Sequence, residues 1–299
     1  MTEPADIDES DFAPAVRALI ESGRDWSEPT SFQEYLKLAF PQRQPRTAQR
    51  LSVQTLTDLD PLLRSHGFMV FHLGSPTGLG GRRTTRFALI KAPSGVEEFF
   101  LVDAKVFACA EETFIPTASY HEMYPFQLLG SIVETGAVNL AIASRLLAEA
   151  LRLDEPSPRL APATGASTYT FKVMPHSLCD VMWDHVAGQV EVDAVVFARR
   201  GGRWTVFVIE GKHGELESLS KLKLAYATLA IATKRVPSDV QIVPVYMRSW
   251  EEEGRLLFGV AECEMVDPRS AQSPVASITV KSARLLSMPF QFGRQLERG

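Results

Sequence analysis

Apolar residues along this chain fall into helical stripes and strand-like runs that alternate over its length. In the first part, apolar positions at helical spacing, each followed by a Gly or Pro, predict three short helices in residues 11–23, 31–40 and 56–67. The third has Asp60 as a candidate N-cap, Pro61 at its first helical position and Gly67 as its terminator. Strands are predicted from the next three apolar runs, in residues 67–74, 84–92 and 97–107.

The second part of the chain continues this alternation with longer elements. A helical pattern runs through residues 124–153, and its predicted apolar side consists of Leu129, Ile132, Val133, Leu140, Leu147 and Leu151. A loop rich in Pro, Ser and Ala then leads into a strand, a hairpin, a helix in residues 218–233 and two further strands. This order predicts an α/β (α+β) fold with a central mixed sheet flanked by helices. We expect residues 1–120 to form an accessory region of mixed helix and strand, and residues 121–299 to form the core with C-terminal strands.

The hairpin around the glycine pair at residues 201–202 is the most informative segment. Two apolar, β-branched runs flank these glycines, a pattern that predicts a two-residue turn. With that turn, cross-strand pairing places Asp193 opposite Glu210, and Glu191 opposite Lys212. Side chains two apart on a strand share a face, so the four charged groups are expected to lie together.

Carboxylates and a lysine on a buried strand are costly unless something binds them. The run from Thr205 to Ile209 is typical of a strand buried on both faces, so the adjacent charges are expected at the edge of a core. Because carboxylate oxygens are the ligands that hard divalent cations prefer, a metal site is one interpretation. An ordinary Glu–Lys pair on a solvent-exposed strand face is the other, and the residues alone leave both open.

Composition narrows the class of protein. The 299 residues are 45% hydrophobic and 22% charged, which is typical of a globular protein with a sizeable core. No apolar run is long enough to span a bilayer, and the acidic N-terminal segment does not resemble a signal peptide. The three cysteines are widely spaced, so we expect free thiols in a reducing cytoplasm.

The net charge of −5 counts mildly against nucleic-acid binding, because phosphate contacts need a positive surface. Local basic patches would be sufficient, although each is equally an ordinary solvated surface. Three arginine clusters are candidates: Arg43, Arg46 and Arg50; Arg82, Arg83 and Arg86; and Arg199, Arg200 and Arg203.

The order of elements and charges in residues 124–248 resembles the PD-(D/E)XK nuclease superfamily, which has the restriction-endonuclease-like fold. The resemblance is carried by Asp193 on one strand, by Glu210-Gly211-Lys212 on the next strand, and by the helix that follows. The proline that the family often has beside the first acid is absent from this chain.

This resemblance implies a set of roles for the matching residues. Asp193, Glu210 and the carbonyl of Gly211 would bind Mg²⁺ or Mn²⁺, and Lys212 would stabilise the attacking hydroxide and the charge that builds on phosphorus. The implied function is an endonuclease that hydrolyses DNA phosphodiester bonds in a restriction or defence setting. By analogy, we expect duplex DNA as its partner, a homodimer as its assembly and the cytoplasm as its location.

Several other charged residues are open to two interpretations. Glu191 is either an added metal ligand or the partner that orients Lys212, and the predicted pairing favours the partner role. Glu134 on the preceding helix is either a further acid of the site or part of a plain polar stripe. Residues 103–105 imitate the acid-x-Lys pattern, but no helix is predicted close behind them, so we interpret Asp103 as an ordinary strand end.

Other polar residues are weaker candidates for membership of the site. His213 is expected on the other face of its strand as a neutral surface or packing histidine, while Lys221 and Lys223 either reach backbone phosphates or serve helix solubility. Two rival functions stay open as well. One is a non-catalytic nucleic-acid-binding or interaction module that retains the nuclease fold. The other is a scaffold protein whose hairpin carries a plain salt bridge.

Overall fold

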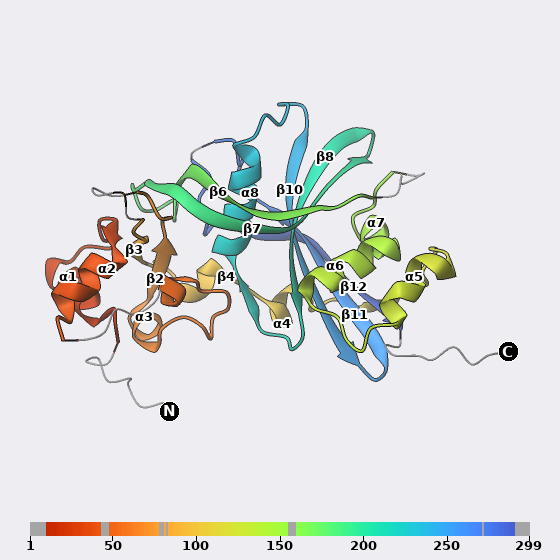
Figure 1. The fold of residues 1–299 in the computed structure, drawn as a ribbon, viewed down its shortest axis with the longest axis horizontal. Helices are drawn as coiled ribbons and strands as arrows, with labels where there is room; N and C mark the ends of the chain where they lie inside the picture. Colours follow the sequence, from red (N-terminus) through yellow and green to blue (C-terminus); the bar gives the residue numbers. More distant parts are fainter. Residues whose placement is uncertain are drawn as a thin grey trace.

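The computed structural model describes residues 10–42, 48–77, 81, 83–154, 160–270 and 272–290. A large mixed sheet runs through the molecule, with helices on both faces and a smaller helix-and-strand region at one end (Figure 1). That smaller region holds the N-terminal elements and packs against the large sheet through a shared hydrophobic core. No helix in the described ranges is long and apolar enough to cross a membrane.

Seven strands form the large sheet, in the order β5-β12-β11-β10-β8-β7-β6. Their bounds are Glu111–Thr113 (β5), Ala163–Val173 (β6), Trp183–Arg200 (β7), Arg203–His213 (β8), Gln241–Glu252 (β10), Arg255–Glu264 (β11) and Thr279–Pro289 (β12). β8 runs parallel to β10, and β12 runs parallel to β5, while the other neighbouring strands are antiparallel. The predicted mixed sheet flanked by helices is therefore confirmed.

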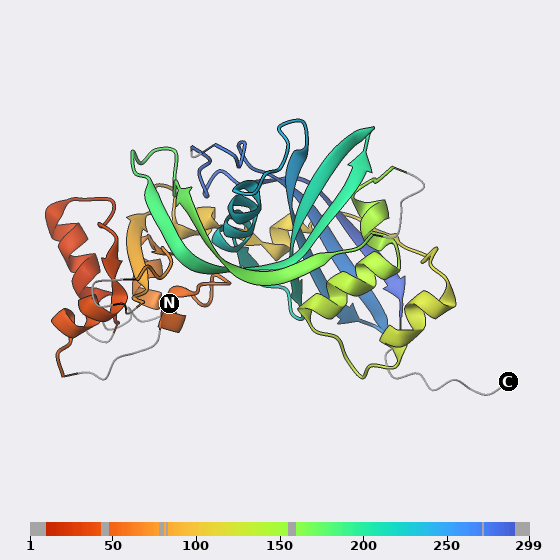
Figure 2. The ribbon, with the colours of Figure 1, turned by 45° about the horizontal axis from the view of Figure 1, so that its top comes forward.

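Different helices cover the two faces of this sheet (Figure 2). They are α5 (Tyr120–Gln127), α6 (Glu134–Ala143), α7 (Leu146–Ala150) and α8 (Lys221–Ala232). Val206 and Val208 of β8 share a core with α8, whereas Phe207 and Ile209 share a core with α6 and α7. Because alternate residues of β8 serve two cores, the prediction that this strand is buried on both faces is confirmed.

In its described residues, the N-terminal region combines three α-helices and one 3₁₀ helix with a small sheet of order β1-β3-β2. Its elements are α1 (Ala13–Ser22), β1 (Thr30–Ser31), α2 (Phe32–Ala39), a 3₁₀ helix (Ala48–Leu51), α3 (Pro61–His66), β2 (Phe68–His72) and β3 (Arg86–Lys91). The three predicted helices and the first two predicted strands are thus confirmed. Asp60 caps α3 as predicted, because its Oδ1 accepts a hydrogen bond from Leu62 N at 2.9 Å, and Gly67 ends the helix with a φ of 73°.

The strand predicted in residues 97–107 is wrong over most of its length. A 3₁₀ helix (Val96–Phe99) leads into the three-residue strand β4 (Phe100–Val102), and α4 (Asp103–Val106) follows at once. β4 pairs with β9 (Ser218–Ser220), which links the N-terminal half of the chain to the start of α8. The run is apolar because the segment crosses the interior of the molecule, not because it alternates along one sheet.

The single helix predicted in residues 124–153 is also wrong, since the segment forms α5, α6 and α7. One break contains Gly130, and the other falls at Arg145, whose φ is 70°. Leu129 and Val133 lie in the first break and are 46% and 71% exposed, so they do not join the apolar side. The other four predicted apolar residues of this segment are buried.

The predicted hairpin is confirmed, with β7 and β8 paired from Arg200–Arg203 to Ala194–Ile209. The glycines at 201 and 202 have φ values of 57° and 77°, the left-handed conformation that a type I′ turn requires. Below Ala194, β7 leaves β8 and continues along β6, with a register shift next to Gly165. The long strand β7 therefore changes its main partner near its middle (Figure 1).

Candidate active site

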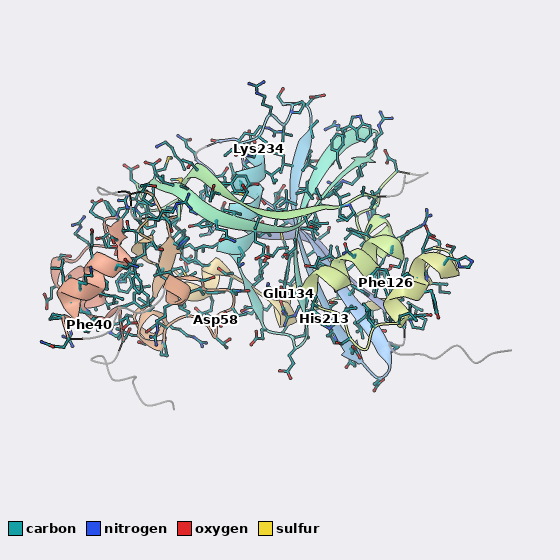
Figure 3. The ribbon with its side chains drawn as sticks, viewed as in Figure 1. Phe40, Asp58, Phe126, Glu134, His213 and Lys234 are labelled. Carbon is teal, nitrogen blue, oxygen red and sulfur yellow. The ribbon has the colours of Figure 1, made fainter. Side chains whose placement is uncertain are left out.

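The change of partner in β7 brings four charged side chains to one corner of the large sheet. Asp193 lies where β7 leaves β8, Glu210 and Lys212 lie near the end of β8, and Glu134 is the first residue of α6. Irregular strand pairing of this kind often re-aims side chains next to active sites. Glu134 lies beside the end of β8, close to His213 (Figure 3). We call these four residues the acid–lysine corner.

Asp193 is tied to β8 by its side chain. Its Oδ2 accepts a hydrogen bond from Gly211 N at 2.8 Å. Packing requires a glycine at this position, because a Cβ on Gly211 would lie 2.6 Å from Cγ2 of Val138 in α6. The glycine between Glu210 and Lys212 therefore lets α6 approach the strand, while its N–H fixes the orientation of the first acid.

Lys212 is buried and held by two acids. Its Nζ donates to both carboxylate oxygens of Glu134 at 3.1 Å and lies 3.6 Å from Oε1 of Glu210. Glu134 is thus the residue that orients Lys212. The predicted pairing of Glu191 with Lys212 is wrong, because β7 has already changed partner and Glu191 lies exposed, opposite Ala166 of β6.

Burial and mutual repulsion shift the protonation of these groups. Burial, and then the neighbouring Asp193, raises the pKa of Glu210 to about 7. Burial also raises the pKa of Asp193, against the opposing effects of Gly211 N–H and Lys212. Burial lowers the pKa of Lys212, but Glu210 and Glu134 together outweigh it, so the net shift of that pKa is upward. Lys212 is therefore an ammonium at neutral pH, while Glu210 is poised between its two forms.

The donor set fits a hard cation that keeps water or substrate among its ligands. A cation between Asp193 and Glu210 would relieve the repulsion that helps to raise the pKa of Glu210. Mg²⁺ is commonly held by one or two carboxylates together with waters and phosphate oxygens. Within the described residues, no group of three or more His, Cys, Asp or Glu side chains is placed to hold a metal ion. The carboxylates that the corner itself offers to a cation are those of Asp193 and Glu210.

A second buried charge cluster lies next to the corner, on β10. Oδ1 of Asp103 accepts a hydrogen bond from Tyr246 OH at 2.7 Å, and its Oδ2 accepts one from Glu217 N at 2.8 Å. Nε of Arg248 lies 3.3 Å from the same Oδ2. Asp103 does follow directly after β4, as predicted for a strand end, but it is not an ordinary one, because this fully buried residue also begins α4 and joins that helix to β10. Sequence reasoning missed Arg248, whose only signal is a charge inside an apolar strand.

Other predicted polar residues have structural roles. The predicted packing role of His213 is confirmed, since its Nδ1 lies 2.9 Å from Oγ of Ser249. Lys221 is buried and donates to the carbonyl of Ala276 at 2.9 Å, so it does not face a phosphate site. The three cysteines are free thiols, as predicted.

The arginine clusters are partly neutralised by acids. Arg50 pairs with Asp11 at 3.4 Å, and Arg200 donates to both carboxylate oxygens of Glu262. Arg199 lies over the ring of Trp204, with its guanidinium carbon 5.5 Å from the ring centre. Three further arginines lie outside the described residues: Arg43, Arg46 and Arg82.

These observations define the class of the molecule: a mixed α/β protein with a partly buried acid–lysine corner on a seven-stranded sheet. The chain belongs to a family described as a domain of unknown function (DUF6997), whose model matches residues 106–279, more than half of the chain. The matched segment contains every residue of the corner. No curated protein and no solved structure matches this chain.

Proposed function

We propose that this chain is a metal-dependent nuclease, a phosphodiester hydrolase that cuts DNA with Mg²⁺ or Mn²⁺. The observation that carries the proposal is the convergence of the half-buried Asp193 with the buried Glu210 and Lys212, from two adjacent strands, on one corner of the sheet. The order α6, α7, β6, β7, β8, β9, α8 and β10, with β10 parallel to β8, fits the restriction-endonuclease-like core that the sequence resembles.

Each residue of the corner has one task in this proposal. Asp193 and Glu210 hold the cation, with the carbonyl of Gly211 as a further candidate ligand. A bound Mg²⁺ supplies Lewis-acid polarisation and lowers the pKa of its water. Lys212 directs its ammonium at the phosphate oxygens and offsets the negative charge that develops there. Glu134 is a positioning residue, because it holds Lys212 through two hydrogen bonds.

The setting of this activity is proposed by analogy with the superfamily. The substrate is duplex DNA, and a homodimer that cuts both strands matches the symmetry of the duplex. Cytoplasmic restriction or defence is the biological role that this analogy favours.

Cleavage of supercoiled plasmid DNA tests the proposal. The wild type is expected to nick or linearise the plasmid with Mg²⁺ or Mn²⁺ and to be inactive in EDTA. Lys212→Ala is expected to lose at least about 100-fold in rate, because it removes the charge that faces the developing anion. Lys37→Ala is the matched control, since Lys37 is an exposed lysine on α2. Cleavage that survives Lys212→Ala, or that persists in EDTA, contradicts the proposal.

The second candidate is a non-catalytic nucleic-acid-binding module. It is favoured by Phe197 and Trp204 on the hairpin, which stack at 4.7 Å and are 52% and 45% exposed. Exposed aromatic rings next to an arginine can stack with nucleic-acid bases. DNA binding that depends on Trp204, without cleavage in either metal, would favour this module over the nuclease.

A further inference from the structure

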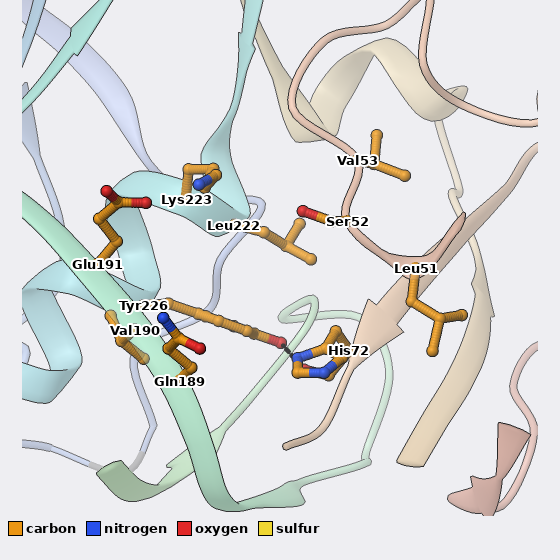
Figure 4. Close-up of a pocket in the computed structure, with 10 residues that line it drawn as sticks. All are labelled: Leu51, Ser52, Val53, His72, Gln189, Val190, Glu191, Leu222, Lys223 and Tyr226. Carbon is orange, nitrogen blue, oxygen red and sulfur yellow. Dashed lines mark hydrogen bonds between the residues drawn. The ribbon is translucent and has the colours of Figure 1, made fainter. Parts of the chain in front are cut away.

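A pocket of about 320 Å³ lies between the N-terminal region and the large sheet (Figure 4). Its walls come from residues 51–53, the end of β2, the bent part of β7 and the first turns of α8. This volume is at the lower end of the about 300–1,000 Å³ typical of ligand pockets. One flat ring with a short substituent suits such a space, whereas a base pair does not.

The walls of the pocket suit a flat aromatic ring. Apolar side chains line it, including the buried Leu51, Val190 and Leu222. Tyr226 crosses the pocket towards His72, and its OH donates to the carbonyl of His72 at 2.9 Å (Figure 4). That hydrogen bond holds the hydroxyl end of the side chain in place, and the rings of Phe171 and His185 pack against the Tyr226 ring, so the pocket has an ordered aromatic wall.

A packed aromatic stack supports Tyr226 from behind. The ring of His185 lies 5.0 Å from the Tyr226 ring and stacks on Phe171 at 4.4 Å. His185 is fully buried, and a Cβ on Gly188 would lie 2.3 Å from its ring. The glycine therefore lets β7 pass directly over the stack. This wall is formed before any ligand binds, which reduces the entropic cost of binding.

Polar groups at the rim match the edge of a nucleobase. Ser52 and Gln189 are exposed, and a hydroxyl and an amide can both donate and accept hydrogen bonds. Base edges present the complementary mixture of donors and acceptors.

The charged part of the rim leads to the acid–lysine corner. Glu191 lines the pocket two residues before Asp193 on β7, and Lys223 lines it from α8. Glu191 and Asp193 are two residues apart on the same strand, so their side chains lie on the same face of β7. The rim at Glu191 therefore continues along that face to the first acid of the corner. A ring in the pocket can carry its phosphate towards the corner.

We propose that this pocket receives one unpaired nucleobase of the DNA strand whose phosphodiester lies at Asp193 and Glu210. The inference rests on the proposed nuclease function and refines its substrate. DNA with a nucleotide already unpaired, at a bulge, mismatch or end, becomes the preferred target over continuous duplex. Extruding a base is least costly at such positions.

The test compares two DNA duplexes that differ at one bulged position, which holds either adenine or an abasic analogue. The wild type is expected to cleave the adenine substrate at least about tenfold faster, since stacking of a single base contributes about that factor. Ser52→Trp fills the pocket from its exposed rim and is expected to reduce this ratio below about threefold. Ser177→Trp is the matched control, an exposed serine that does not line the pocket, and it keeps the wild-type ratio.

Gln189→Ala is a milder second variant, because it removes only an exposed amide from the rim. It is expected to lower the ratio by about threefold, the effect of about one hydrogen bond. A wild type that cleaves both substrates at the same rate overturns the pocket proposal and leaves the proposed function intact. A ratio that neither variant changes overturns it as well.

A failure of the nuclease proposal gives a different result: neither DNA substrate is cleaved in Mg²⁺ or in Mn²⁺. The pocket is then tested by binding alone, with 2-aminopurine at the bulged position and Ca²⁺ in solution. A fluorescence change that is equal in the wild type and in Ser52→Trp overturns the pocket. Free deoxyadenosine monophosphate is added as a competitor. If it binds as tightly as the oligonucleotide, the proposal that the pocket takes a base of a DNA strand is overturned, and the pocket is assigned to a soluble nucleotide.

Discussion

At the scale of single residues, the corner sets three carboxylates against one ammonium, and two of these four groups are buried. Glu210 is 3% exposed and Lys212 is 6% exposed, so their charges are poorly screened. Lys212 keeps its proton because acids surround it, while Glu210 gives up its proton only near neutral pH. A cation at this corner would replace the proton of Glu210, which predicts a dependence of stability on both pH and metal.

Glu210→Gln tests the pH dependence. The folded state raises the pKa of Glu210 from 4.5 to about 7, so the folded protein binds this proton more tightly than the unfolded chain does. The stability that protonated Glu210 contributes to the folded state is therefore present below pH 4.5 and is lost as the pH rises through about 7. The variant cannot ionise, so relative to the wild type it should be about 1–3 kcal/mol more stable at pH 8 than at pH 5. Urea unfolding without divalent ions measures this, and a difference that does not vary with pH contradicts it.

Thermal unfolding with added Mg²⁺ tests the metal dependence. At pH 8 the unfolding temperature of the wild type should rise with the logarithm of the Mg²⁺ concentration, because the ion binds the folded state. Asp193→Asn and Glu210→Gln each remove one carboxylate and should lose most of this rise. Glu97→Gln, an exposed acid far along the chain from the corner, is the control. An equal rise in all four proteins would show that Mg²⁺ binds elsewhere.

At the scale of elements, local sequence patterns predicted the hairpin correctly. The other contacts of the site could not be predicted, because they depend on packing between elements that are far apart in the sequence. The two-glycine turn fixes the register of β7 and β8 through neighbouring residues alone, so the positions of Asp193 and Glu210 could be inferred. The pairing of Glu191 with Lys212 failed because β6 takes over the lower part of β7. No local sequence pattern predicts that β7 changes its partner from β8 to β6. The role of Glu134 likewise depends on how α6 docks on β8.

Gly211→Ala tests the docking of α6 on β8. The added Cβ would lie 2.6 Å from Cγ2 of Val138, so we expect a loss of about 1–3 kcal/mol in the free energy of unfolding. Val138→Ala removes that methyl, so in the double variant the loss from Gly211→Ala should shrink. Urea unfolding of the four proteins gives the coupling between the two sites. Additive losses would mean that this contact does not determine the need for glycine.

At the scale of the whole molecule, strand pairings join parts of the chain that are distant in sequence. β5 pairs with β12 in the large sheet, and β4 pairs with β9 in a separate two-stranded sheet, so residues 100–113 are paired with strands of the C-terminal half. Sequence patterns predicted most of the strands but neither these pairings nor β12 itself, since strand order depends on contacts far apart in sequence. Asp103 joins the same parts of the chain through buried polar contacts to Glu217 and Arg248.

Asp103→Ala tests this junction. The variant leaves Arg248 buried without its acid, so we expect a loss of about 3–5 kcal/mol in the free energy of unfolding. Asp103→Ala combined with Arg248→Met removes the unpaired charge and should recover part of that loss. Unfolding in guanidinium chloride measures both variants. A double variant that is less stable than Asp103→Ala alone would contradict the assignment of a buried ion pair.

The most direct test of the central claim is a crystal structure of the protein soaked in Mn²⁺, with anomalous diffraction recorded to locate the ion. We expect a manganese peak coordinated by the carboxylates of Asp193 and Glu210, with Nζ of Lys212 facing the open side of the ion. A peak at other residues only, or a fully soaked crystal with no peak between these two acids, would contradict it.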